Sequence, residues 1–257
     1  MGIIKVNNYD EMSNAMNIIK VKNYDEMSKT AAEIIIKKIN QSSHCTLGLA
    51  TGSTPEGFYR YLVKDHMLHH TSYQHVKTFN LDEYAGLNRE NENSYYYYMN
   101  HHLFNHINIP PDNIHLPNGK KETIEDECKH YEELIEQNGG IDIQVLGIGH
   151  NGHIGFNEPG TSFQSKTHVV ELDDTTRKAN SRFFKTIDEV PTHAITMGIS
   201  TIIKSKEILL LVSGKSKAQA FQRLLEDETS EEFPASILKQ HLNITVIVDR
   251  DAYGLNR

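Results

Sequence analysis

The chain has 257 residues, of which 38% are hydrophobic and 23% are charged, and its formal net charge is −8. These values indicate a globular protein with a substantial core and exclude a largely disordered chain. The acidic balance argues against nucleic-acid binding, which needs a basic surface. The longest apolar runs have the length of a strand, so no membrane-spanning segment is expected.

The amino-terminal segment contains a near-perfect repeat. Residues 3–13 (IIKVNNYDEMS) recur at residues 18–28 (IIKVKNYDEMS) with one substitution. A single extra copy does not make a repeat fold, which needs at least three units. One copy is predicted to supply the first strand, and the other is surplus. We expect residues 1–15 to be a non-native or dispensable extension and residues 16–257 to form a single domain.

Strands and helices alternate through the rest of the chain. The predicted strands are short apolar or alternating runs, at Thr46–Ala50, Val76–Leu81, Ile141–Leu146, Ile208–Val212 and Ile244–Val248. The predicted helices lie between and around them, at Tyr24–Ile39, Thr54–Leu68, Ser94–His106, Ile124–Gln137, Arg177–Thr186 and Ser216–Glu226. This alternation predicts one α/β domain with a doubly wound, mostly parallel sheet and helices on both faces.

Two features favour a reducing compartment. The two cysteines, Cys45 and Cys128, provide no disulfide framework. Acidic residues occur early, at Asp10 and Glu11, where a signal peptide would have its apolar core. We therefore expect a cytoplasmic protein.

The most informative segment is Gly147–Pro159 (GIGHNGHIGFNEP), which follows a predicted strand. Glycines let the backbone turn tightly and approach a ligand, and open α/β sheets bind ligands beyond the carboxyl ends of their strands. Asn151, His153 and Glu158 lie among these glycines. A plain glycine-rich connector is the alternative, but it does not account for the imidazole and the carboxylate.

Other predicted strand ends also carry polar residues. The turn Thr51–Pro55 (TGSTP) opens a helix, where free N–H groups and the helix dipole favour phosphate, although an ordinary helix cap is the alternative. Asp82 and Glu83 follow a strand, and because neighbouring strand residues face opposite ways, at most one enters a given pocket. Ser213–Lys217 (SGKSK) and Arg182 add cations, for which ordinary surface charges are the alternative.

Together these segments resemble the glucosamine-6-phosphate deaminase family. The matching segments are Ala50–Pro55, Phe79–Tyr84 (FNLDEY), Gly149–Pro159, Asn180–Phe184 (NSRFF) and Ser213–Lys217. They occur in the order of the family, and the resemblance covers roughly residues 17–250. The resemblance implies a reversible conversion of glucosamine 6-phosphate and water into fructose 6-phosphate and ammonia.

The resemblance also implies a role for each matching residue. The implied phosphate-binding residues are Thr51, Gly52, Ser53, Thr54, Arg182 and Lys217. His153 would pass a proton between the anomeric hydroxyl and the ring oxygen, while Glu158 and Asn151 orient its ring. Asp82 would then move a proton from C2 to C1, which suits a carboxylate whose pKa is raised by burial.

The expected partners are few. The resemblance implies a small sugar phosphate as ligand and neither a metal nor an organic cofactor, because the C2 hydrogen of the open-chain sugar is already acidic. His102 and His106 lie one helical turn apart without an evident third ligand, so we interpret them as a solvated helix face. We expect no nucleic-acid or membrane partner, and the sequence leaves a homo-oligomer open.

The chain differs from some members of the family at two places, and one of its loops is a candidate lid. Some members carry Asp where this chain has Asn151, so this position must act here through hydrogen bonds. Thr167–Val170 (THVV) lacks the basic pair through which some members bind N-acetylglucosamine 6-phosphate, so we expect no such activation. Residues 160–185 are polar and follow the catalytic motif, which makes them a candidate lid.

Two other functions compete with this interpretation. Hydrolysis of 6-phosphogluconolactone on a related fold shares the phosphate-binding logic, but it does not require Asp82 to be paired with the Asn151, His153 and Glu158 cluster. A sugar-phosphate sensor would append a basic helix-turn-helix, which residues 1–45 lack, and it would be expected to lose the catalytic acids.

Overall fold

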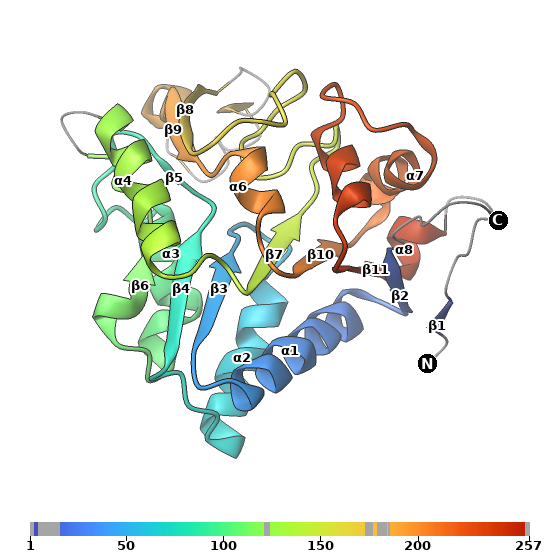
Figure 1. Ribbon diagram of the computed structural model, residues 1–257, viewed down its shortest axis with the longest axis horizontal. Helices are drawn as coiled ribbons and strands as arrows, with labels where there is room; N and C mark the ends of the chain where they lie inside the picture. Colours follow the sequence, from blue (N-terminus) through green and yellow to red (C-terminus); the bar gives the residue numbers. More distant parts are fainter. Residues whose placement is uncertain are drawn as a thin grey trace.

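An eight-stranded sheet lies at the centre of the fold (Figure 1). The computed structural model describes residues 3–4, 16–120, 124–172, 177–178, 184 and 186–254. The strands of this sheet are β1 (Ile3–Ile4), β2 (Asn17–Val21), β3 (Cys45–Leu49), β4 (Val76–Asn80), β6 (Ile114–His115), β7 (Ile143–Gly147), β10 (Ile208–Val212) and β11 (Ile244–Asp249). Their spatial order is β1-β2-β11-β10-β7-β3-β4-β6, and every neighbouring pair except β1–β2 is parallel. The predicted mostly parallel sheet is confirmed.

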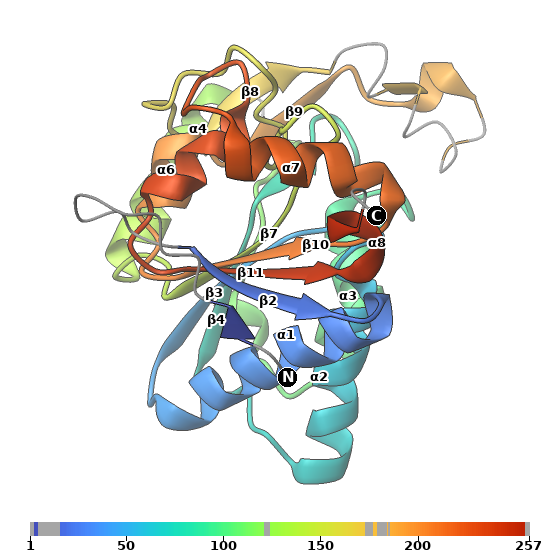
Figure 2. The same cartoon turned by 90° about the vertical axis from the view of Figure 1, so that its right-hand side faces the viewer.

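Helices cover both faces of this sheet (Figure 2). The described helices are α1 (Tyr24–Gln41), α2 (Glu56–His69), α3 (Tyr95–His102), α4 (Ile124–Gln137), α6 (Ile199–Ile203), α7 (Ala218–Glu226) and α8 (Arg250–Tyr253). One core cluster joins the sheet to α1, α2 and α3, and the other joins the opposite face to α4, α6 and α7. The doubly wound arrangement is therefore confirmed.

Strand β10 shows why the apolar runs of the sequence belong to the centre of such a sheet. All five residues of β10 are buried. Leu209 and Leu211 belong to the core cluster of α1 and α2, whereas Leu210 and Val212 belong to the cluster on the other face. Because successive side chains point to opposite faces, a strand covered on both sides must be apolar throughout.

A second, three-stranded antiparallel sheet was not anticipated from the sequence. It contains β5 (Asp82–Tyr84), β8 (His168–Glu171) and β9 (His193–Thr196), in the order β5-β9-β8. These strands are three or four residues long, too short for an alternating pattern to be recognised. The chain thus leaves the main sheet after Asn80 and enters the second sheet at Asp82, which pairs with Thr196.

Several predicted helices differ from the structure at their ends. Ser94 caps α3 as predicted, its hydroxyl accepting a hydrogen bond from Tyr97 N at 3.0 Å, but the helix stops at His102 and a 3-10 turn, η1 (Phe104–His106), follows. The predicted helix at 216–226 begins with another such turn, η5 (Lys215–Lys217). Most of the predicted helix Arg177–Thr186 lies outside the described residues.

The two copies of the amino-terminal repeat contribute different elements to the described structure. The second copy supplies β2, which pairs in parallel with β11, and Asn23, whose side chain caps α1 by accepting from Glu26 N at 2.9 Å. The first copy contributes β1, which pairs with β2 at Ile3 and Ile4, and its residues 5–13 lie outside the described part.

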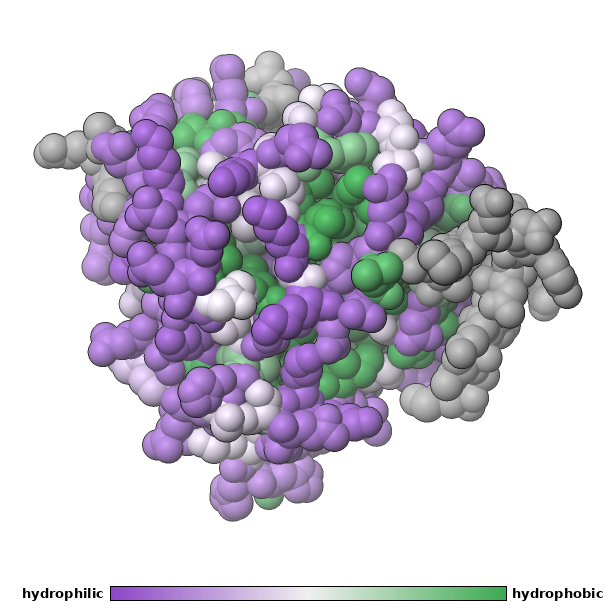
Figure 3. All heavy atoms as spheres, viewed as in Figure 1, coloured by the Kyte–Doolittle hydropathy of each residue, from purple (hydrophilic) through white to green (hydrophobic). Residues whose placement is uncertain are grey.

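The surface matches the composition. The face in Figure 3 is largely hydrophilic, and its hydrophobic residues form separate patches between polar side chains. Among the described helices, none combines the length and the apolar character that crossing a bilayer requires.

Candidate active site

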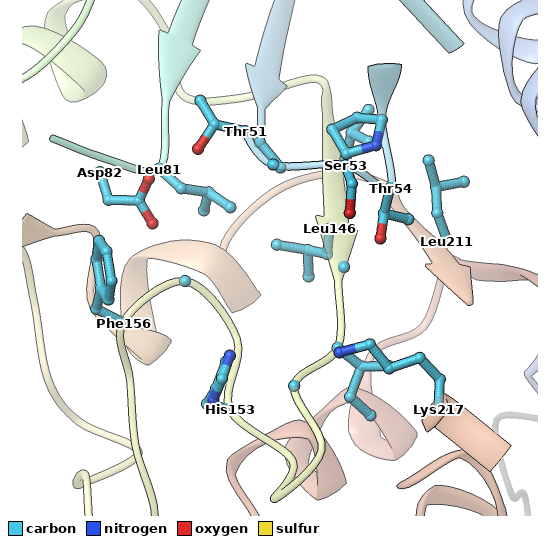
Figure 4. A pocket seen from close by; sticks show the side chains of 18 of the residues that line it. Thr51, Ser53, Thr54, Leu81, Asp82, Leu146, His153, Phe156, Leu211 and Lys217 are labelled. Atoms are coloured by element: carbon cyan, nitrogen blue, oxygen red, sulfur yellow. The ribbon is translucent and has the colours of Figure 1, made fainter. Parts of the chain in front are cut away.

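A cavity of about 290 Å³ opens where the central strands β3, β4, β7 and β10 end (Figure 4). It is lined by predicted site residues from four separate segments, namely Thr51, Gly52, Ser53, Thr54, Asp82, His153, Glu158 and Lys217. Asp82 and His153 lie toward one end of this cavity, and Ser53, Thr54 and Lys217 lie toward the other. The structure therefore brings these eight predicted residues to one cavity.

Glycines allow the loop after β7, residues 148–159, to pack closely around the cavity. A Cβ atom on Gly149 would lie 2.3 Å from Cε1 of His153, so this imidazole fits against the loop only because position 149 is glycine. Gly155 has φ +60, and a Cβ there would lie 2.9 Å from the Thr196 hydroxyl and 3.6 Å from the Asp82 carboxylate. The loop thus approaches Asp82 closely, as short glycine turns permit.

His153, Glu158 and Asn151 form a connected cluster. Nδ1 of His153 lies 3.2 Å from Oε1 of Glu158, and Asn151 Nδ2 donates a hydrogen bond of 2.6 Å to Oε2 of the same carboxylate. The backbone N–H of His153 donates to Asn151 Oδ1 at 3.2 Å, which closes the cluster. A carboxylate beside Nδ1 favours the tautomer that is protonated there and leaves Nε2 as a base. Asn151 does not line the cavity itself, and its side chain contacts Glu158, which does.

Asp82 and Glu83 have opposite orientations. The Glu83 carboxylate accepts hydrogen bonds from the backbone N–H groups of Tyr84 at 2.8 Å and of Tyr95 and Tyr96 at 2.9 Å, so it caps the first turn of α3. Burial raises the pKa of Glu83, and these three donors oppose that rise. Asp82 is 7% exposed and lines the cavity, and burial, followed by the charge of Glu83, raises its pKa to about 8.

This raised pKa predicts a measurable effect on stability. Because the Asp82 pKa is 3.8 without these influences and about 8 in the folded chain, folding takes up a proton between these values, and stability falls as the pH rises through that window. The Asp82→Asn variant lacks the ionisable group. At high pH we expect this variant to have a free energy of unfolding at least about 1 kcal/mol greater than that of the natural chain. Its thermal midpoint should therefore be higher.

The difference between the two proteins should shrink as the pH falls, because the natural carboxyl group is then protonated in both states. Thermal unfolding followed by circular dichroism at a series of pH values measures it. A difference in midpoint that is the same at every pH would contradict the raised pKa of Asp82.

The turn Thr51–Thr54 lies between β3 and α2 and has the properties of an anion site. Tyrosine hydroxyls donate hydrogen bonds to backbone carbonyl groups of this turn and of the residue before it. Tyr24 donates to Ser53 O at 2.9 Å, Tyr98 to Gly52 O at 2.7 Å, and Tyr59 to Ala50 O. Within the described structure, the N–H groups of the four turn residues donate no hydrogen bond. Free N–H groups before a helix bind phosphate readily.

Lys217 supplies a cation to the same cavity. It ends η5, is half-buried, and burial lowers the pKa of its ammonium group. The buried carboxylate of Asp249 holds the preceding loop, accepting from Gly214 N at 3.1 Å and from the Ser213 hydroxyl. Arg182, the other predicted cation, lies outside the described residues.

Three further cavity residues with an aromatic or imidazole ring were not predicted from the sequence. Tyr95 and Phe156 line it with nearly parallel rings whose centroids are 6.2 Å apart, and His150 lies beside the β7 end. Phe156 and His150 belong to the glycine-rich segment, so their position was a usable signal. Tyr95 had none, because only the fold brings α3 to β5. No metal-binding group of three His, Cys, Asp or Glu side chains occurs among the residues that the structure describes.

Comparison with known proteins identifies relatives along nearly the whole chain. The family model for glucosamine-6-phosphate isomerases/6-phosphogluconolactonase matches residues 22–247. A glucosamine-6-phosphate deaminase of Oceanobacillus iheyensis is 59% identical over 98% of this chain and 95% of its own length. Glucosamine-6-phosphate deaminase 1 of Bacillus subtilis is 55% identical over 84% of this chain and 90% of its own.

Solved structures agree with these matches. The structure of a monomeric glucosamine-6-phosphate deaminase of the NagB superfamily is similar with a TM-score of 0.92 at 52% identity, covering 94% of this chain and all of that one. The 6-phosphogluconolactonase from Trypanosoma cruzi is similar with a TM-score of 0.78 at 21% identity, over 96% of this chain and 99% of that one. The second likeness shows a shared fold.

Proposed function

The chain belongs to the family of glucosamine-6-phosphate isomerases and 6-phosphogluconolactonases, and we propose that it is a glucosamine-6-phosphate deaminase. It converts glucosamine 6-phosphate and water into fructose 6-phosphate and ammonia. The observation that carries this proposal is the shared cavity, in which Asp82 and His153 lie toward one end and Ser53, Thr54 and Lys217 lie toward the other. The deaminase relatives, at 59% and 55% identity, support it.

The first step opens the sugar ring. With the phosphate group on the Thr51–Thr54 turn and Lys217, His153 removes the proton of the anomeric hydroxyl and returns one to the ring oxygen, so that the C1–O5 bond breaks and C1 becomes an aldehyde. Glu158 stabilises the imidazolium that forms in between, and Asn151 holds this carboxylate in place.

The second step moves a proton from C2 to C1. Asp82 removes the C2 proton, the electron pair forms a C1–C2 double bond, and the aldehyde oxygen takes a proton from water, which gives an enolamine. Return of the proton to C1 leaves an imine at C2. Water adds to that carbon and ammonia departs, giving the ketone of fructose 6-phosphate. A carboxyl group with a pKa of about 8 suits this exchange, because proton transfer is most efficient near neutrality.

One assay separates this activity from its rivals. Purified chain is incubated with glucosamine 6-phosphate, and released ammonia and fructose 6-phosphate are measured, in parallel with 6-phosphogluconolactone as substrate. Equal amounts of ammonia and ketose phosphate are expected, with no hydrolysis of the lactone above the uncatalysed rate. Lactone hydrolysis alone would favour the lactonase, and binding without turnover of either compound would favour a sugar-phosphate sensor.

The eight predicted site residues that line the cavity all belong to a single chain. We propose that the enzyme works in the cytoplasm on a free sugar phosphate and that a homo-oligomer, which the sequence leaves open, is not required for turnover. The solved deaminase at 52% identity is monomeric, which supports this proposal. Light scattering of the active enzyme after gel filtration tests it.

Residues 160–185 are the proposed lid over the bound sugar. Their amino-terminal part is tied down, because Gly160 N donates to Glu231 O at 2.9 Å and Phe163 N donates to the Glu231 carboxylate at 2.8 Å. The ring centroid of Phe184 lies 6.1 Å from that of Tyr84, which follows Asp82 by two residues on β5. This contact supports the proposal, because it joins the segment to the strand that carries Asp82.

Lys217 provides a prediction about substrate affinity. Replacing it with Ala removes the cation of the phosphate end, and we expect KM for glucosamine 6-phosphate to rise by about 10- to 100-fold, the usual worth of a hydrogen bond to a charged group. The matched control is Lys215→Ala, since Lys215 is an exposed lysine of the same turn that does not line the cavity. Equal effects of the two changes on KM would contradict the phosphate-binding role.

Deletion of residues 1–15 is predicted to leave the enzyme active. The second copy of the repeat forms β2 and the start of α1, so the deletion removes the two-residue strand β1 and leaves β2 as the edge of the main sheet. We expect kcat and KM within about twofold of the full chain. Loss of turnover in a shortened chain with an unchanged circular dichroism spectrum would show that the first copy is needed.

A further inference from the structure

His150 lines the active-site cavity but has no part in the mechanism above. It lies between Gly149 and Asn151, where the chain leaves β7, and its side chain is exposed. An exposed imidazole inside a cavity built for an anion is an unused titratable group, and its surroundings indicate what it does.

The charged groups and imidazoles that line the cavity with His150 are Lys217, His153, Glu158 and Asp82. Lys217 reaches the cavity from η5, and His153 lies on the same loop as His150. Glu158 is occupied by His153 and Asn151, and Asp82 lies toward the end of the cavity away from Lys217. The charge of Lys217 is the largest influence on His150 and lowers its pKa, and burial and His153 lower it further. Without a bound anion, these influences favour the neutral form of the imidazole.

We propose that His150 is a further phosphate-binding residue, which takes up a proton as the sugar phosphate binds and so makes substrate affinity depend on pH. This inference rests on the proposed function. A phosphate group bound by Lys217 brings close to two negative charges beside the imidazole, which reverses the field that kept it neutral. The imidazolium then adds a second cation to Lys217 in a protein that is acidic overall.

The sign of the pH dependence follows from this exchange. A group whose pKa is higher in the complex than in the free enzyme takes up protons on binding. Affinity is then greatest at a pH below the pKa of free His150 and is lost as the pH rises through the pKa of the complex. The phosphate group itself titrates near pH 6, so only a comparison with a variant that lacks the imidazole isolates the part due to His150.

The test is calorimetric titration of the enzyme with the product, fructose 6-phosphate. Titrations at about pH 7 in two buffers of different ionisation enthalpy give the number of protons taken up. We expect the natural chain to take up more protons than His150→Asn, and this variant to bind about three- to tenfold more weakly near pH 6.5 but equally well near pH 8.5. His150→Lys, which is charged at both values, should bind tightly at both. His130→Asn, at an exposed position of α4 outside the cavity, should behave like the natural chain.

The outcomes are distinct. The same proton uptake by the natural chain and His150→Asn would overturn the inference and leave the deaminase proposal standing if ammonia release is observed. Weak binding by His150→Lys near pH 8.5, equal to that of His150→Asn, would also overturn it, because a permanent charge would then bring no gain. Failure of the natural chain to bind fructose 6-phosphate would overturn both this inference and the proposed function.

Discussion

Replacement of Asp82 with Asn is expected to lower the turnover of glucosamine 6-phosphate by about 10²- to 10⁴-fold, the usual contribution of a general base. The amide keeps the shape of the side chain but cannot accept the C2 proton. Because the phosphate end of the cavity is unchanged, KM should stay within about threefold of its natural value. The defining measurement is exchange of the C2 hydrogen with solvent deuterium, followed by NMR.

The neighbouring carboxylate provides the control. Glu83 accepts three backbone hydrogen bonds at the start of α3, so Glu83→Gln should lower stability and leave C2 exchange measurable. The pH profile adds a second readout. The base must be ionised, so kcat of the natural enzyme should rise with pH up to about 8 and then level off. Near-normal C2 exchange in Asp82→Asn would show that another group is the base.

The main sheet could be predicted because its strands are specified locally. Ile208–Val212 is apolar at every position, which only a strand covered on both faces requires, and the helix at Ile124–Gln137 has the observed bounds. The second sheet could not be predicted in this way. The strand Asp82–Tyr84 exists because it pairs with His193–Thr196, and a pairing between residues so far apart in the sequence leaves no local pattern.

The same limit applies to the site. Its polar residues were found because they follow strands whose carboxyl ends meet at one edge of the sheet. Apart from the family resemblance, which implied Asp82, the sequence could not decide which of Asp82 and Glu83 faces the cavity, because that depends on where the N–H groups of α3 lie. Nor could it assign Tyr95 to the cavity or give the pKa of Asp82, since both depend on packing between distant segments.

Replacement of His153 with Gln is expected to lower kcat/KM for glucosamine 6-phosphate by about 10²- to 10³-fold, because no other group at that position can exchange a proton between O1 and the ring oxygen. The effect should be confined to ring opening. A 5-deoxy analogue of the substrate cannot close the pyranose ring, and for this compound C2 exchange should fall by less than about fivefold, since Asp82 is unchanged.

This difference between the two substrates separates catalysis by His153 from a structural role. The ring lies against Gly149 and beside Glu158, so its loss disturbs the loop that approaches Asp82 through Gly155. A general disturbance of that loop would damage both substrates alike, whereas loss of the ring-opening proton exchange damages only the closed one. Equal losses for both compounds would therefore remove the assigned role of His153, and with it the reason for Glu158 and Asn151 to be where they are.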